Sequence, residues 1–199
     1  MTDKKQARYI TEKERERILK CQSGNKYEER NLAIVYLGFS TGMRAHELKN
    51  LKMYNLFDQE WCLRETCHLE GWQTKGEYGA GSFSIRLKRV RSAMLEYIDY
   101  RKKRKNIKLD DFFFITQKRG QFKGTSMPNL IRQIFRDAGI YDASSHSMRR
   151  TFATDFSYAN PNPKLLQTVL RHKTSAMSLN YVAVNPRIIE DTIDKAFNW

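Results

Sequence analysis

The chain has 199 residues, a length that fits one domain with a hydrophobic core of its own. Forty per cent of the residues are hydrophobic and 12% are aromatic, which argues against global disorder. The 36 Lys and Arg residues outnumber the 22 Asp and Glu residues, and the net charge of +14 favours a polyanionic partner such as nucleic acid. No apolar run approaches the roughly 18 residues that span a bilayer, and no signal-peptide pattern is present. We therefore expect a cytoplasmic protein without membrane contact.

The expected elements are helices, then a small sheet, then helices again. Thr11 and Glu14 form a capping box at the start of the first helix. Gly42 follows the second helix at a position that glycine favours. Short strands are expected in EWCLRETCHLE, GWQTK and SFSIRL. Helices are expected at about residues 11–22, 27–40, 44–51, 88–105, 126–138, 146–158, 163–171, 175–182 and 187–197. The predicted fold class is α+β, mostly α, with a three-stranded antiparallel sheet in the first half.

Two short motifs place arginines beside other functional side chains. In TGMRAHELKNL, Arg44 and Glu47 are separated by one helical turn and share a face. In HSMRRTF, His146 and Arg149 are likewise one turn apart, and together they can serve one phosphate. Arg150 points about 100° away from Arg149. Each motif alone is equally compatible with an ordinary exposed helix surface.

The stretch RHKTSAMSLNYV contains His172 and Tyr181, nine residues apart. On one continuous helix these two side chains would face opposite ways, because nine residues turn the helix by about 900°. Thr174 and Ser175 are good N-cap residues, so the helix can break between His172 and Tyr181. The sequence permits the two side chains to converge, and it also permits Tyr181 to be a packing residue.

Taken together, these motifs resemble the tyrosine recombinase (integrase) family. The blocks that match are TGMRAHELKNL, HSMRRTFATDF and LQTVLRHKTSAMSLNYV, and the resemblance runs from about residue 11 to residue 182. It implies a catalytic set in chain order: Arg44, Lys75, His146, Arg149, His172 and Tyr181. The length of this chain and the point at which it starts also resemble those of the single-domain fimbrial phase-variation invertases.

The resemblance implies a role for each of these residues. Tyr181 would attack a DNA phosphodiester and form a 3′-phosphotyrosyl link, while Arg44 and Arg149 stabilise the charge of the transition state. Lys75 would protonate the 5′-oxygen. His146 would assist proton transfer with the tyrosine, and His172 would hydrogen-bond the phosphate. This chemistry needs no metal and no cofactor. The candidates for supporting the site or contacting DNA are Glu47, Arg150, Arg171 and Lys173.

The chain departs from the family pattern in three ways. Arg171 stands before His172 where the family usually has Gly. The sequence after Lys75 is not the usual basic run. Only about ten residues precede the first expected helix, whereas most members carry an N-terminal DNA-clamping domain. We expect an N-terminal extension at 1–10, a catalytic domain at 11–186 and a helical tail at 187–199.

The expected partners are double-stranded DNA and other copies of the chain, as a tetramer on two DNA sites, with accessory DNA-bending proteins as further candidates. The tail would dock on a neighbouring protomer or on its own chain. Three alternative functions stay open beside recombination at this stage. They are DNA relaxation of the type IB topoisomerase kind, a DNA-binding regulator without catalysis, and an RNA-binding protein, which lacks a supporting motif.

Overall fold

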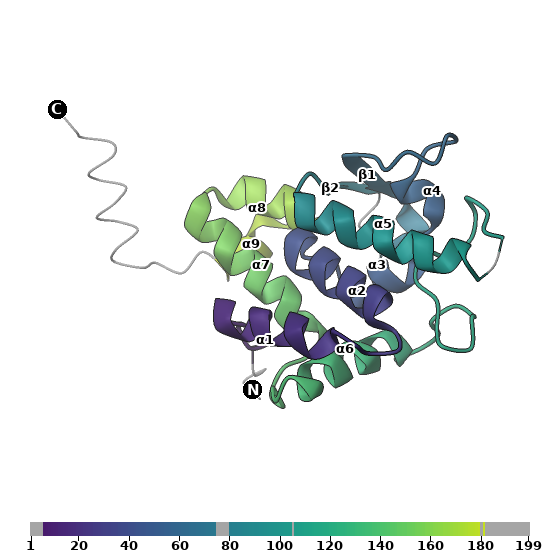
Figure 1. The fold of residues 1–199 in the computed structure, drawn as a ribbon. Coiled ribbons are helices and arrows are strands. Elements are labelled where there is room, and N and C mark those ends of the chain that lie inside the picture. The colour runs from purple at the N-terminus through teal and green to yellow at the C-terminus, as the bar shows by residue number, and fades with distance from the viewer. Residues whose placement is uncertain (1–5, 75–79, 105, 180, 182–199) are drawn as a thin grey trace.

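The computed structural model describes residues 6–74, 80–104, 106–179 and 181. In these ranges the chain forms a mostly helical fold with one small sheet (Figure 1). The helices are α1 (Glu12–Gln22), α2 (Glu28–Thr41), α3 (Ala45–Asn50), α4 (Met53–Leu56), α5 (Lys88–Lys102), α6 (Ser126–Asp137), α7 (Ser145–Ala159), α8 (Pro163–Leu170) and α9 (Ser175–Leu179). The strands are β1 (Thr66–Leu69) and β2 (Gly81–Ser84), which pair antiparallel.

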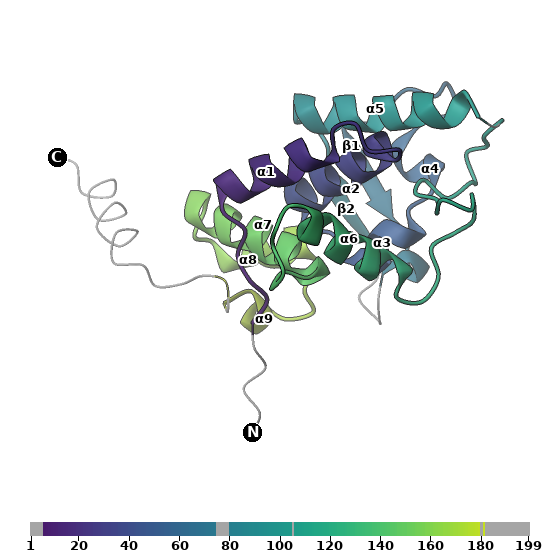
Figure 2. The same cartoon turned by 60° about the horizontal axis from the view of Figure 1, so that its bottom comes forward.

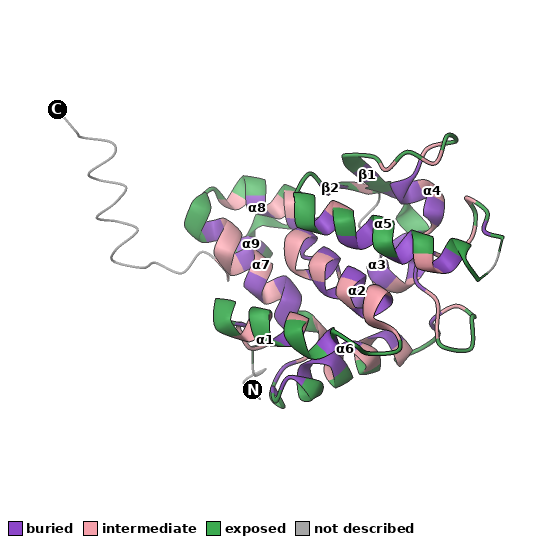
Figure 3. Cartoon of the chain, viewed as in Figure 1, coloured by how far each residue is buried: buried purple, intermediate pink, exposed green. Residues whose placement is uncertain are grey.

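The central element is α2, which contacts α1, α5 and α7. Figure 2 shows α1 crossing α2, with α5 on one side and α7 to α9 gathered on the other. Figure 3 shows that α2 is mostly buried or half-buried, while α1 and α5 have exposed outer faces. The pattern follows from the sequence of α2, whose run LAIVYLGF offers apolar residues on several faces.

Local signals at the helix ends agree with the sequence predictions. The Glu14 N–H donates to the Thr11 hydroxyl and the Glu14 carboxylate accepts from the Thr11 N–H, which is the predicted capping box. Gly42 ends α2 with φ of 62°, in the left-handed region that glycine adopts without a steric penalty. The elements as a whole confirm the predicted fold class, α+β and mostly α.

The predicted number of strands was wrong for the described residues, which contain two strands instead of three. Gly71–Gln73, inside the expected strand GWQTK, forms a 3₁₀ turn, η1. The reason is the buried Gln73 side chain, whose amide nitrogen donates to Asn50 O at 2.7 Å and to Asn55 Oδ1 at 2.7 Å. These bonds hold the segment on α3 and α4, so it does not pair as a strand.

The core consists of one large cluster and one small cluster of buried apolar side chains. The small cluster comprises Ala153, Leu166 and Leu170, and Tyr181 packs against it. Residues of the expected N-terminal extension pack on α7, since Ile10 N donates to Thr151 Oγ1 at 2.9 Å. None of the described helices combines the length and the apolar character needed to cross a membrane.

Candidate active site

The turn between α2 and α3 positions Arg44 and Glu47. Arg44 directly precedes α3, and its backbone N–H donates to Glu47 Oε2 at 3.0 Å. The Arg44 Nη1 donates to Glu47 Oε1 at 3.0 Å. Because the Glu47 side chain is fully buried, this pair is not an exposed surface contact of the kind that contributes little to stability.

Glu47 binds a second arginine from a distant part of the sequence. Arg171 Nη2 donates to Glu47 Oε2 at 2.7 Å, and the Arg171 side chain is only 4% exposed. Burial raises the pKa of Glu47, but the Arg171 guanidinium and the Arg44 N–H outweigh it, so this pKa lies below its usual value. Glu47 therefore stays ionised between two guanidinium groups.

Arg171 reaches Glu47 from an unusual backbone conformation. It follows α8 with φ of 54° and ψ of 49°, a left-handed conformation that costs energy for residues other than glycine. Its side chain also packs against β2, where a Cβ added at Gly81 would overlap it. Within the described residues its buried Nε has no hydrogen-bond partner. The ion pair with Glu47 offsets these costs.

Arg149 connects the turn after α2 with the end of α8. It is buried on α7, and its Nη1 donates to Gly42 O at 2.7 Å while its Nη2 donates to Leu170 O. The pKa of Arg149 is lowered to about 9, chiefly by burial and then by the neighbouring Arg44, while Glu47 and Tyr181 oppose the shift. Arg149 therefore stays protonated at neutral pH and lies close enough to Tyr181 to sense its charge.

The start of α7 places the other residues of the HSMRRTF motif. The N-cap residue Ser144 accepts from the His146 N–H at 3.3 Å, and the His146 side chain is exposed one turn before Arg149. Arg150 lies on a different face and donates to the side chain of Gln6. The predicted helix position of both residues is thus observed, and Arg150 contacts the N-terminal segment.

The helix is interrupted between α8 and α9, and this interruption brings His172 and Tyr181 together, as the sequence permitted. The two rings stack with centroids 6.0 Å apart and an interplanar angle of 19°. His172 Nδ1 shares a hydrogen bond of 2.9 Å with the buried Ser178 hydroxyl. The pKa of His172 is lowered to about 4, chiefly by burial and then by Arg149 and Arg44, so the imidazole is neutral at pH 7.

Two predicted features lie outside the described residues. They are Lys75 and the tail at 187–199. Lys173 is described, and its side chain is exposed beside His172 at the rim of a cavity of about 850 Å³ between β2 and α8. No group of His, Cys, Asp or Glu side chains large enough to hold a metal ion occurs in the described part of the chain.

Three guanidinium groups thus lie near one carboxylate, which binds two of them directly, beside a neutral imidazole and a tyrosine. The arginines are Arg44, Arg149 and Arg171, and the carboxylate is Glu47. This arrangement leaves positive charge uncompensated at a site where water is partly excluded. Such a site suits a phosphate group and stabilises it more strongly than an exposed arginine would.

Comparison with known proteins agrees with the motifs. The model of the phage integrase family matches residues 8–187, which is most of the chain. The chain belongs to the phage integrase family. The resemblance to tyrosine recombinases is therefore confirmed.

Curated integrase-family relatives are distant in sequence and longer than this chain. The transposase from transposon Tn916 of Enterococcus faecalis is 25% identical over 194 residues, which cover 87% of this chain and 47% of the transposase. Tyrosine recombinase XerC of Leptospira interrogans is 24% identical over 189 residues, covering 92% of this chain and 57% of XerC. The chain spans about half the length of these relatives.

Solved structures show the same fold. The Tn1549 transposon integrase in complex with transposon right end DNA superposes with a TM-score of 0.78 at 21% identity, covering all of this chain and 69% of that one. The XerA recombinase superposes with a TM-score of 0.75 at 23% identity, covering 99% and 66% of the two chains. At this level of identity the likeness concerns the fold.

Sequence reasoning missed several residues that hold the site together. Ser178 was not among the predicted site residues, although its spacing from His172 across a helix start could have suggested a contact. No local signal indicates that Arg149 bonds the carbonyl groups of Gly42 and Leu170. Likewise, nothing in the sequence pairs Arg171 with Glu47.

Proposed function

We propose that this chain cleaves and rejoins DNA strands at specific sites through a covalent link to Tyr181. The observation that carries the proposal is the convergence of Arg44, Arg149, His172 and Tyr181, which come from four separate segments. Among the similar solved structures, the Tn1549 integrase is in complex with transposon right end DNA, and the XerH recombinase is bound to its palindromic difH substrate. They support double-stranded DNA as the substrate here, as does the charge of +14.

In the proposed reaction, the Tyr181 oxygen attacks the phosphorus and the bond to the 5′-oxygen breaks. A 3′-phosphotyrosyl link and a free 5′-hydroxyl result. Arg44 and Arg149 bind the non-bridging oxygens, and both are held in place before DNA arrives. Because the phosphodiester energy is conserved in the tyrosyl link, rejoining is the reverse of the same step.

His172 acts in this scheme as a neutral hydrogen-bond donor. Its pKa of about 4 keeps it uncharged at pH 7. When the Ser178 hydroxyl donates to Nδ1, the proton resides on Nε2, which is then able to donate to a phosphate oxygen. The exposed His146 accepts the tyrosine proton, and Lys75 protonates the departing 5′-oxygen.

The test is a covalent-adduct assay with nicked suicide DNA that the protein demonstrably binds. We expect a protein–DNA adduct on a denaturing gel, and we expect Tyr181→Phe to abolish it while the matched variant Tyr141→Phe retains it. Tyr141 is 76% exposed, precedes α7 and is not one of the proposed catalytic residues. Bound DNA without any adduct would instead indicate a regulator without catalysis. Relaxation of supercoiled DNA without exchange between sites would indicate topoisomerase-like activity.

The role of Lys75 has a sharper test. A 5′-bridging phosphorothiolate has a thiol as its leaving group, which departs without protonation because a thiol is far more acidic than an alcohol. Lys75→Ala should therefore fail on ordinary DNA and cleave the phosphorothiolate substrate at nearly the normal rate. Equal loss on both substrates would assign the lysine a different role.

We further propose that copies of the chain assemble on two DNA sites, with accessory DNA-bending proteins as additional partners, in the cytoplasm at the nucleoid. The charge excess supports association with chromosomal DNA. Removal of residues 187–199 tests the tail: lost assembly on DNA with intact DNA binding supports docking between protomers. Unchanged assembly supports packing on its own chain.

A further inference from the structure

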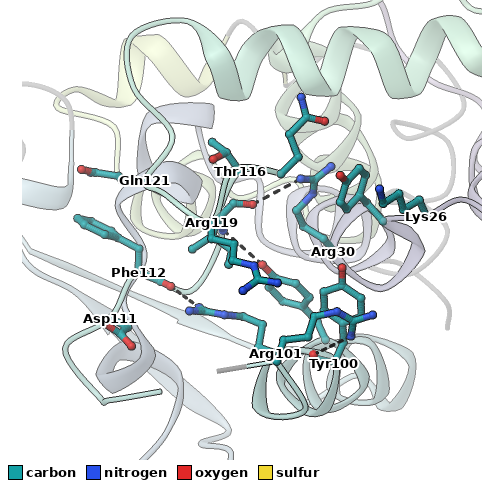
Figure 4. A pocket seen from close by; sticks show the side chains of 14 residues that line it. Lys26, Arg30, Tyr100, Arg101, Asp111, Phe112, Thr116, Arg119 and Gln121 are labelled. Atoms are coloured by element: carbon teal, nitrogen blue, oxygen red, sulfur yellow. Dashed lines mark hydrogen bonds between the residues drawn. The ribbon is translucent and has the colours of Figure 1, made fainter. Parts of the chain in front are cut away.

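A second cationic pocket lies at the other end of α2 from Arg44. Its volume is about 340 Å³, and it is enclosed by the start of α2, the end of α5 and the segment 111–121 (Figure 4). Arg30 lines it from α2, 14 residues before Arg44, which places the two roughly 20 Å apart along the helix direction. None of the proposed catalytic residues lines this pocket.

The pocket is strongly positive. One carboxylate, that of Asp111, faces five cationic side chains: Lys26, Arg30, Arg101, Arg104 and Arg119. In the part of the chain that the structure describes, no ion pair joins any of these cations to a carboxylate. Asp111 balances only part of this positive charge, so an anion bound between the cations would be stabilised.

Two of these arginines are nearly inaccessible. Arg101 is 5% exposed, and its Nη1 donates to the carbonyl groups of Phe112 and Phe113. Among the described residues, its Nε and Nη2 have no hydrogen-bond partner. Arg30 is 6% exposed and bonds the Asn31 side chain. The Nε and Nη2 of Arg101 are not among the described side-chain nitrogens that are buried without a partner, so they open onto the pocket and are available to an anionic ligand.

The segment 116–121 adds a cation from a tight turn. Ile115 and Gln121 form an isolated antiparallel bridge, and Thr116 N donates to Gly120 O at 2.8 Å. Arg119 has φ of 61° in this turn, where glycine would be favoured. Figure 4 shows Arg30, Arg101 and Arg119 reaching the pocket from α2, α5 and this turn.

Aromatic rings form the rest of the wall. The Arg30 guanidinium lies over the Tyr27 ring at 4.6 Å from its centroid, and that of Arg104 lies over Tyr100 at 3.7 Å. Stacked guanidinium and phenol groups offer flat surfaces to a nucleobase, and the free N–H groups offer donors to a phosphate. A bare inorganic anion would use only the second of these features.

We propose that this pocket binds a nucleoside phosphate, with the phosphate between Arg101, Arg119 and Arg104 and the base against the stacked arginine–tyrosine pairs. The ligand has two sources with the same chemistry, a free nucleotide or one nucleotide of a nucleic-acid strand. Binding here is independent of the chemistry at Tyr181, so the proposal does not depend on strand cleavage.

The experiment is calorimetric titration of the full chain with adenosine monophosphate, with adenosine and inorganic phosphate as comparison ligands. A fluorescein-labelled single-stranded oligothymidylate, followed by anisotropy, probes the strand source. The pocket variant is Arg104→Ala with Arg119→Gly. Both side chains are exposed, and glycine adopts the backbone conformation of residue 119 freely, so the fold is preserved. Arg17→Ala with Lys20→Ala removes the same number of positive charges from exposed positions of α1 and serves as the control variant.

For a free nucleotide we expect saturable binding of adenosine monophosphate, at least about tenfold tighter than adenosine or phosphate and about tenfold weaker in the pocket variant. For a strand source, the monophosphate does not saturate, and the oligothymidylate binds about tenfold more weakly to the pocket variant than to the control variant. The proposal is overturned when the pocket variant binds both probes as well as the control variant does.

Discussion

The Glu47 carboxylate lies 2.7 Å from Arg171 Nη2, across 124 residues of sequence. Its other oxygen binds Arg44 at 3.0 Å, so one carboxylate fixes two guanidinium groups from opposite sides of the site. Arg149 makes a parallel connection, from Gly42 O to Leu170 O. The distance between Arg44 and the α8–α9 segment is therefore set by two bridges at once.

Glu47→Gln should destabilise the chain by about 3–5 kcal/mol, because it leaves the buried Arg171 and the half-buried Arg44 without their counter-charge. Covalent adduct formation should fall together with stability, since Arg44 loses its orientation. Urea denaturation of Glu47→Gln beside Glu16→Gln, an exposed position on α1, provides the measurement. Equal stability of the two variants would show that Glu47 does not hold the site together.

Replacement of Arg171 separates backbone strain from the ion pair. Both Arg171→Gly and Arg171→Ala remove the contact with Glu47, but only glycine relieves the left-handed conformation at φ 54°. The glycine variant should therefore be about 1 kcal/mol more stable than the alanine variant, and both should be less stable than the natural chain. Chemical denaturation compares the three proteins. A glycine variant more stable than the natural chain would mean that the ion pair contributes less than the strain costs.

Gly42→Ala should damage the site more than a similar change elsewhere. A Cβ at Gly42 would lie 2.6 Å from Phe152 Cδ1 and 2.9 Å from Leu170 Cδ2, in addition to the strain at φ 62°. Gly24→Ala has comparable strain at φ 76° and meets no atom within 4 Å. We expect a loss of about 1 kcal/mol at Gly24 and 1–3 kcal/mol more at Gly42. Thermal unfolding of both variants tests this difference, and equal losses would show that the contacts with Phe152 and Leu170 relax freely.

The depressed pKa of His172 predicts a pH-dependent stability. In the unfolded chain His172 titrates near 6.5, whereas in the folded chain its pKa is about 4. The unfolded state thus binds more protons between these values, so stability is full above pH 6.5 and falls as the pH drops toward 4. The loss reaches up to about 3 kcal/mol.

His172→Gln isolates this contribution, because acidic groups titrate in the same range in both proteins. Denaturation curves from pH 7 to pH 4 should show a smaller decline for the variant than for the natural chain. An identical decline in the two proteins would place the titrating group elsewhere.

The sequence by itself determined the local structure around the candidate residues. The capping box of Thr11 and Glu14, the helix end at Gly42 and the helix break before Ser175 all depend on neighbours a few residues away. The spacings from His146 to Arg149 and from His172 to Tyr181 were legible for the same reason. Together with the resemblance, they indicated the family and the arrangement of the site.

Only the tertiary structure decided which side chains hold the site and how they are charged. Glu47 became a shared counter-charge because packing brings α3 against the end of α8 and excludes water from both. The same burial keeps His172 neutral, and it turned the expected strand at Gly71–Gln73 into a 3₁₀ turn anchored on α3 and α4. The pocket of Arg30, Arg101 and Arg119 likewise joins three distant segments. Burial and long-range pairing depend on the whole fold, and no pattern of near neighbours encodes them.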